Sequence, residues 1–287
     1  MTTDTDASME SPQAGPAERP LVYKQFFATR LTHWVWAACL FFLLLSGLQI
    51  FNAHPALYIG DQSGFAFDNA VLRIGAERTE DARNIGYIQL FGAKFETTGW
   101  FGFYRGDNGM MQQRAFPPWA TIPSYYDLAS GRIVHFFFAW IFAITLLAWL
   151  VASIVNGHLR RDILPRWRDI CALPRDIAAH ARLRFHHSRD YNTLQKLTYA
   201  AVLLVLMPLM IATGLAMSPG FNAAAPWLAD ILGGRQTART IHFAVMLLLV
   251  GFFVVHIVMV LAAGPINELR SIVTGWYRAD PESREGN

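Results

Sequence analysis

Four long apolar runs dominate the hydropathy pattern of the chain. They cover residues 31–51, 133–155, 197–217 and 241–263. Each run is long enough to cross a hydrocarbon core as an α-helix, which needs about 20 apolar residues. None alternates strictly between apolar and polar positions, so the strands of a membrane β-barrel are excluded. The pattern therefore predicts four membrane-spanning helices.

The segments outside these runs divide the chain further. Residues 1–22 are rich in Ser, Thr, Asp, Gln, Gly and Pro, which predicts a disordered tail ahead of one domain over 23–278, with a short tail at 279–287. The connection 52–129 is too long to be a simple link between two helices. It contains short strand-like runs separated by glycines at 71–74, 87–91 and 94–97.

Composition and charge support a membrane protein and orient it. The chain is 53% hydrophobic and only 16% charged, too apolar for an ordinary soluble domain. The loop 157–196 carries nine basic residues against four aspartates. The basic residues are Arg160, Arg161, Arg166, Arg168, Arg175, Arg182, Arg184, Arg189 and Lys196. By the positive-inside rule this loop is cytoplasmic. The arginines thus have a topological role, and no nucleic-acid partner is predicted.

This orientation completes the predicted architecture. With four spans, both termini are cytoplasmic, and the loops 52–129 and 218–238 lie on the other side of the membrane. Residues 1–20 contain no apolar core typical of a cleaved signal, so the first span is expected to direct insertion into a bacterial inner membrane. We predict an all-α membrane protein, a four-helix transmembrane bundle with a large, partly strand-containing extracytoplasmic loop between spans 1 and 2.

Two histidines lie fourteen residues apart in the last apolar run, His242 and His256. An imidazole at membrane depth is costly without a partner. Fourteen helical residues rise about 21 Å and return to within about 40° of the starting face. His33 and His135 lie near the ends of the first two runs, so four histidines fall at two levels: His33 and His256 at the inner edge, His135 and His242 at the outer edge.

Two imidazoles that face each other across a bundle are what bis-histidine haem ligation requires, and such an iron transfers electrons. Other readings stay open. Histidines near span ends are often boundary residues that reach water. A haem-free membrane anchor or transporter would use intramembrane histidines for proton relay. A single zinc site cannot use both histidines of the last span, because about 21 Å separates them.

An arginine precedes three of the four histidines by one helical turn. The spacing Arg-x-x-His places both side chains on one helix face. Such an arginine can extend toward water and pair with a haem propionate, although a membrane-boundary arginine is the simpler alternative. The pairs are Arg30 with His33, Arg132 with His135, and Arg239 with His242.

Other features of the sequence predict local structure and surface contacts. The aromatic segments 100–104 and 116–119 of the outer loop fit either headgroup contacts or a platform for an extracytoplasmic partner. His54 has no companion at ligand spacing and is read as a surface residue. Pro208 is expected to kink the third span, and Gly264 with Pro265 to end the fourth. A short amphipathic helix is expected over 165–184.

The two cysteines, Cys39 and Cys171, lie in a span and in the basic loop, so no disulfide is predicted. The chain has neither a Cys-x-x-Cys-His motif nor a cysteine cluster. Covalently attached c-type haem and iron–sulfur clusters are therefore not expected.

Several motifs together resemble one family of membrane proteins. They span roughly 23–278 and include RLTHW at 30–34, HSRDYN at 187–192, GLAMSP at 214–219, GRQ at 234–236 and GPIN at 264–267, with the histidines above. The chain resembles the four-span dihaem cytochrome b subunits of bacterial molybdoenzymes and nickel–iron hydrogenases, and is most similar to the thiosulfate-reductase type. It departs from them in the long outer loop.

The resemblance implies a function and a set of site residues. It implies an electron-transfer subunit with two haem b groups, which exchanges electrons between membrane quinone and an extracytoplasmic redox partner, often a molybdopterin oxidoreductase. By analogy, His33 and His256 hold the inner haem iron, and His135 and His242 the outer one. Quinone is expected beside the inner haem, where the candidate polar residues are His187, Asp190, Asn192 and Asn267. Capping of the third helix is the alternative role of Asp190 or Asn192.

Overall fold

The computed structural model describes residues 20–64, 68–106, 109–166, 171, 173–174 and 193–279. Along the described chain the elements are β1 (Leu21–Tyr23), α1 (Phe27–Phe51), β2 (Ala56–Tyr58), β3 (Ala70–Arg78), β4 (Asn84–Leu90), β5 (Ala93–Glu96), β6 (Gly102–Arg105), β7 (Met111–Arg114), η1 (Pro118–Ala120), α2 (Leu128–Val155), η2 (Leu159–Ile163), α4 (Thr193–Ala201), η3 (Val202–Leu206), α5 (Met207–Met217), α6 (Pro219–Ala224), α7 (Trp227–Ile231), α8 (Arg235–Ala263), α9 (Pro265–Thr274) and β8 (Trp276–Arg278).

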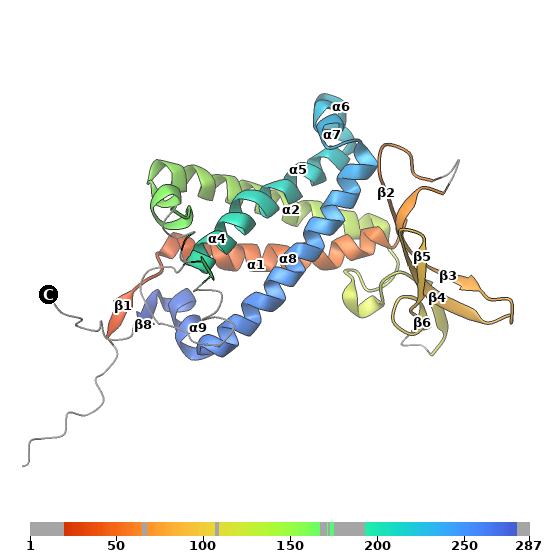
Figure 1. The fold of residues 1–287 in the computed structure, drawn as a ribbon, viewed down its shortest axis with the longest axis horizontal. Helices are drawn as coiled ribbons and strands as arrows, with labels where there is room; N and C mark the ends of the chain where they lie inside the picture. The colour runs from red at the N-terminus through yellow and green to blue at the C-terminus, as the bar shows by residue number, and fades with distance from the viewer. Residues whose placement is uncertain are drawn as a thin grey trace, which may run out of the picture.

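Four of these helical stretches are long and apolar enough to cross a membrane, as predicted: Phe27–Phe51, Leu128–Val155, Thr193–Met217 and Arg235–Ala263. Each begins four to six residues before its apolar run, because a helix continues through polar residues whose side chains can extend toward water. In the bundle α1 packs along α2 and α5 along α8, and α8 runs obliquely across the others (Figure 1).

The bundle has an apolar core between its two ends. Phe142 and Leu146 of α2 are almost fully buried, and Val245 and Leu249 of α8 pack in the same cluster. The outward faces of the helices carry exposed large hydrophobic side chains, such as Ile144 at 62% exposure. An apolar exterior over four spans is what lipid contact requires.

The third span departs from regular α-helix where a proline was expected to kink it. It consists of α4, the π-helical turn η3 and α5, and Pro208 stands in the first turn of α5. Pro208 has no N–H to donate to the carbonyl of the preceding turn, so the hydrogen-bond ladder is interrupted there. A single π turn within an α-helix accommodates such an interruption.

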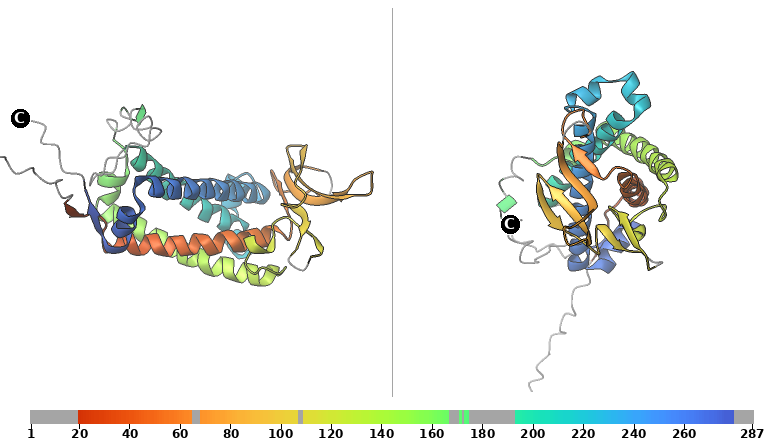
Figure 2. Two further views of the ribbon diagram at one scale, coloured as in Figure 1. Left: turned by 90° about the horizontal axis from the view of Figure 1, so that it is seen from below. Right: turned by 90° about the vertical axis from the view of Figure 1, so that its right-hand side faces the viewer.

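The chain between α1 and α2 forms two small antiparallel sheets at one end of the bundle (Figures 1 and 2). One has the strand order β2-β3-β4-β5 and the other pairs β6 with β7. Strands were predicted at β3, β4 and β5, and the structure confirms all three. β2, β6 and β7 were not predicted, because these short segments lack a readable alternation of apolar and polar residues. We call residues 52–127 the strand module.

Polar side chains join the strand module to the end of α1. The Asn52 amide donates to the carbonyl of Phe116 (3.3 Å) and accepts from its N–H (2.8 Å). Arg114 of β7 donates to the side chain of buried Gln49, to Thr121 Oγ1 (2.8 Å) and to the Ser124 carbonyl (2.7 Å). These bonds fix the module directly over one end of the bundle.

The opposite end of the bundle holds the two ends of the described chain (Figure 2). α8 ends at Ala263, as the Gly264–Pro265 pair predicted, and α9 begins at once. β1 pairs with β8, and the Ala279 N–H donates to the Pro20 carbonyl (3.1 Å). Leu21 and Val22, which were predicted as part of the tail 1–22, belong to a strand that only the distant β8 completes.

The amphipathic helix expected over 165–184 falls almost entirely outside the described residues. Cys39 and Cys171 are both free cysteines, the first buried in α1 and the second exposed.

Candidate functional site

The four intramembrane histidines form two facing pairs. The ring centroids of His33 on α1 and His256 on α8 lie 6.4 Å apart, with their planes inclined at 55°. The rings of His135 on α2 and His242 on α8 are also 6.4 Å apart, inclined at 58°. α8 therefore contributes one histidine to each pair.

The two pairs lie at opposite ends of the bundle because of the helical period. His242 and His256 are separated along the unbroken α8 by about 21 Å. The buried Val245 and Leu249 stand between them in sequence, in the apolar core. The His135–His242 pair lies toward the strand module, and the His33–His256 pair toward α9. We call them the module-side pair and the α9-side pair.

Each histidine of the module-side pair meets a buried hydroxyl group. The His135 Nδ1 lies 3.1 Å from Ser46 Oγ of α1, and the His242 Nδ1 lies 2.9 Å from Thr213 Oγ1 of α5. Both hydroxyls are completely buried. Ser46 donates its own proton to the Phe42 carbonyl (2.6 Å), and Thr213 donates to that of Leu209 (2.7 Å).

These contacts determine which ring nitrogen carries the proton. A hydroxyl has one proton, and here it goes to the helix backbone, so the oxygen accepts from the imidazole. Nδ1 of His135 and of His242 is then protonated, and the free lone pair of each ring is on Nε2. This is the tautomer that a metal-ligating histidine adopts when its other nitrogen is hydrogen-bonded.

A glycine follows each hydroxyl residue and lies against the same ring. A Cβ at Gly47 would be 3.3 Å from His135 Cε1, and one at Gly214 would be 3.5 Å from His242 Cε1. The missing side chain at Gly47 lets α1 approach the His135 ring closely, whereas a Cβ at Gly214 would make an ordinary van der Waals contact.

The surroundings of the α9-side pair are different. The Trp34 ring meets the His33 ring edge-on at 5.3 Å, and Phe252 stacks on His256 at 5.8 Å. The Nδ1 of His33 is buried and has no hydrogen-bond partner among the described residues. The Trp34 indole N–H donates to the Ile272 carbonyl at the end of α9 (3.4 Å).

Two of the three predicted arginines are half-buried beside the pairs. Arg239 donates to the His54 carbonyl and lies over the Phe51 ring, and Arg30 donates to the Val273 carbonyl (2.6 Å). Arg132 is exposed and stacks over the Phe136 ring instead. None of the ion pairs among the described residues involves these three arginines.

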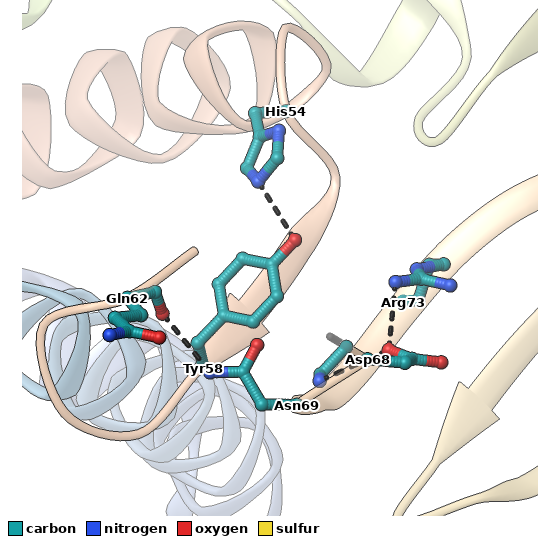
Figure 3. Close-up of polar contacts among 7 residues, drawn as sticks. His54, Tyr58, Gln62, Asp68, Asn69 and Arg73 are labelled. Carbon is teal, nitrogen blue, oxygen red and sulfur yellow. Dashed lines mark hydrogen bonds and ion pairs between the residues drawn. The ribbon is translucent and has the colours of Figure 1, made fainter. Parts of the chain in front are cut away.

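His54 is not the isolated surface residue that the sequence suggested. Figure 3 shows its ring directed at the Tyr58 hydroxyl, with Nε2 at 3.0 Å. On the next strand Arg73 pairs with Asp68 at 3.0 Å. Burial, and then the positive charges of Arg239 and Arg73, lower the pKa of the His54 imidazole from its ordinary 6.5. Sequence spacing could not reveal this, because the arginines come from other elements.

The segment from His54 to Asp61, here called the strap, binds the start of α8. The Gly60 carbonyl accepts from the N–H groups of Gln236 (3.0 Å) and Thr237 (3.2 Å), and Asp61 accepts from that of Arg235 (3.2 Å). Thr237 accepts in turn from the Gly60 N–H (2.7 Å). A helix N-terminus leaves such N–H groups without intrahelical partners, so the strap caps the helix that carries His242.

A comparison with known protein families identifies the arrangement. The family model described as prokaryotic cytochrome b561 matches residues 25–275. The chain belongs to the prokaryotic cytochrome b561 family. It is also 24% identical over 234 residues to the "putative protein-methionine-sulfoxide reductase subunit YedZ1" of Azospira oryzae. The aligned residues cover 80% of this chain and 86% of that protein. The resemblance stated from the sequence motifs is thus confirmed at the level of the family.

Membership makes the protein a multi-pass membrane cytochrome b of electron transport, and its histidine pairs fit haem b. An imidazole nitrogen lies about 2 Å from a metal ion that it ligates and about 1 Å from its ring centre, so two ligands on one iron have centroids about 6 Å apart. Both pairs show 6.4 Å. No group of three or more His, Cys, Asp or Glu converges in the described part of the chain, and a pair suffices for an iron held by a porphyrin.

The predicted quinone residues are less well placed by the structure. His187, Asp190 and Asn192 lie outside the described residues. Asn267 on α9 donates to the Arg278 carbonyl (3.0 Å) and accepts from its N–H (2.9 Å), so its amide already joins α9 to β8.

Sequence reasoning missed Ser46 and Thr213 as neighbours of the module-side histidines. A signal for them exists: each is a hydroxyl residue followed by glycine near the end of an apolar run, Ser46-Gly47 and Thr213-Gly214. Hydroxyl residues in spans usually bond their own helix, so the dipeptide gains meaning only when it faces a histidine.

Proposed function

We propose that this cytochrome is a dihaem subunit that carries electrons across the membrane between quinone and an extracytoplasmic redox partner. The observation that carries the proposal is the two facing histidine pairs, held about 21 Å apart along α8. His33 with His256, and His135 with His242, would each ligate one haem b. Haem b, when bound by two histidines, supplies a one-electron carrier without an open position for substrate.

The charge pattern supports one orientation of the chain in the membrane. The basic loop 157–196 lies between the second and third spans, and the positive-inside rule places it in the cytoplasm together with both termini. The α9-side pair is then the inner one, and the module-side pair faces the extracytoplasmic space of a bacterial inner membrane. The strand module would stand between the outer haem and a soluble partner.

Arg30, Arg132 and Arg239 would pair with the haem propionates. Arg239 and Arg30 are half-buried cations outside every ion pair of the described residues, and each lies one turn from a proposed ligand. A carboxylate in their vicinity would offset the cost of burying the charge. Arg132 is exposed, so it would pair with a propionate only from the surface of the bundle.

The partner is inferred from the name of the related protein, and the quinone from the resemblance to the dihaem cytochrome b subunits. The related protein is named as a subunit of a methionine-sulfoxide reductase, which favours a molybdopterin oxidoreductase as the partner. This chain would then be the electron-transfer subunit of a complex and not a stand-alone enzyme. Quinone would exchange near the inner haem, beside His187, Asp190, Asn192 and Asn267.

Haem content and ligand variants test the dihaem proposal. The purified chain should bind two b-type haems, measured as iron per protein and as a reduced-minus-oxidised spectrum. His256→Ala should remove the inner haem and His242→Ala the outer one, whereas His158→Ala, outside both pairs, should keep both. A wild-type chain without b-type absorption would instead favour a haem-free membrane anchor or transporter. Retention of both haems by both ligand variants would refute the pairing.

The quinone step needs its own measurement. In membranes, a quinol should reduce the haems of the wild-type chain, and Asp190→Asn should slow that reduction while chemical reduction by dithionite remains complete. Equal rates in the two proteins would remove Asp190 from the quinone site.

A further inference from the structure

The module-side pair differs from the α9-side pair in the groups behind its rings. Each module-side imidazole has a hydroxyl on its Nδ1, Ser46 at 3.1 Å and Thr213 at 2.9 Å. The Nδ1 of His33, by contrast, is buried without a partner among the described residues. We propose that Ser46 and Thr213 are positioning residues that set the orientation and basicity of the two outer haem ligands, and so lower the reduction potential of the outer haem.

The geometry of each hydroxyl makes it an acceptor with little freedom. Ser46 is bonded to the Phe42 carbonyl at 2.6 Å, and Thr213 to the carbonyls of Leu209 (2.7 Å) and Met210 (3.0 Å). Each hydroxyl proton is therefore directed at the backbone one turn earlier, and the oxygen lone pairs face the ring. The helix itself fixes the acceptor, since neither side chain can rotate without losing its backbone bond.

An acceptor on Nδ1–H acts on the other nitrogen of the ring. Drawing the Nδ1 proton toward oxygen increases the electron density on the ring and raises the basicity of Nε2. A more basic ligand stabilises ferric iron relative to ferrous iron, so the potential falls. The effect applies to both ligands of the outer haem, because both rings have the same contact.

The adjoining glycines leave room for the rings beside these hydroxyls. A Cβ at Gly47 would lie 3.3 Å from His135 Cε1, and one at Gly214 would lie 3.5 Å from His242 Cε1. The directional contact of each ring is therefore its Nδ1 hydrogen bond to the hydroxyl.

The inference rests on the proposed function, and the test separates the two. Ser46→Ala and Thr213→Val remove the hydroxyls with little change in volume. In the double variant, the oxidised-to-reduced ratio of the outer haem at a given ambient potential should be about tenfold lower in a redox titration of the purified holoprotein. For one electron, this corresponds to a reduction potential about 59 mV higher. The low-spin ferric EPR signal of that haem should also change, because it depends on the angle between the ligand planes.

Two kinds of control keep the test decisive. Thr145→Val removes a half-buried α2 hydroxyl that donates to the Ile141 carbonyl (2.7 Å) and accepts from the Trp36 indole N–H (3.0 Å) but contacts no histidine. This variant should leave the outer potential unchanged. Ser46→Thr and Thr213→Ser keep the hydroxyls and should keep the native potential and EPR signal.

The outcomes are distinguishable. A wild-type chain with no haem, or with one, contradicts the proposed function itself. Two haems in wild type and an unshifted outer potential in the double variant overturn the inference alone. If the double variant loses its outer haem, haem binding at native potential in the hydroxyl-keeping variants supports the inference, and loss of haem there as well overturns it.

Discussion

Gly234 is the residue on which the junction between the strap and α8 most depends. It is the N-cap of α8, with φ +102° and ψ 163°, a backbone conformation that is essentially restricted to glycine. A Cβ at this position would lie 2.5 Å from Asp61 Oδ1 and 2.7 Å from the Gly60 carbonyl oxygen. The second contact is with backbone, so Gly234→Ala cannot be relieved by moving a side chain alone.

The cost of Gly234→Ala can be worked from these contacts. The backbone conformation costs about 1–3 kcal/mol for a residue with a side chain. Moving the strap breaks four hydrogen bonds to Arg235, Gln236 and Thr237, each worth about 1 kcal/mol, so with the backbone cost the junction should lose about 5–7 kcal/mol in all. A loss of about 3 kcal/mol already raises the population of the open junction by about 100-fold.

Amide hydrogen exchange measures that population directly. The N–H groups of Arg235, Gln236 and Thr237 begin a helix and have no intrahelical acceptor, so their protection reports on the strap. Exchange in the peptide that covers them should be at least about 100-fold faster in Gly234→Ala.

The neighbouring glycine is the matched control. Gly233 has φ +81°, but a Cβ there would come only within 3.6 Å of Thr237. Gly233→Ala should therefore show the backbone cost alone, about 1–2 kcal/mol. Equal exchange in the two variants would refute the reasoning that Gly234 lacks a side chain in order to admit the strap.

Two further predictions concern the strand module. Asn52→Ala leaves both backbone groups of Phe116 without the Asn52 side chain, so we expect a loss of about 2 kcal/mol of stability, measured as a lower melting temperature in detergent. The control Asn84→Ala, at an exposed position, should leave the melting temperature unchanged. An unchanged melting temperature in Asn52→Ala would contradict the assigned bonds. The pKa of His54 is lowered in the fold, so below pH 6.5 the unfolded chain binds more protons and stability falls as pH falls. His54→Gln should flatten this decline between pH 7 and 5, and an unchanged slope would show that His54 does not cause it.

The sequence by itself determined the membrane architecture and the levels of the four histidines. Hydropathy is a local property, and each span meets lipid through its own side chains, so the runs could be read one at a time. Likewise, once the segment is a helix, the fourteen-residue spacing places His242 and His256 about 21 Å apart on nearly the same face. The strands β3, β4 and β5 were also readable locally, since glycines separate their apolar runs in the sequence.

Only the tertiary structure decided what surrounds those histidines. Ser46 and His135 are 89 positions apart, and the strap reaches α8 across more than 170 positions. Hydroxyls in spans and glycines before a helix are common in themselves, and packing of separate helices turns them into partners of a ring or of a helix end. His54 shows the limit most clearly: its neighbours in sequence suggested a free surface residue, whereas the arginine of another helix and a tyrosine of a strand determine its environment.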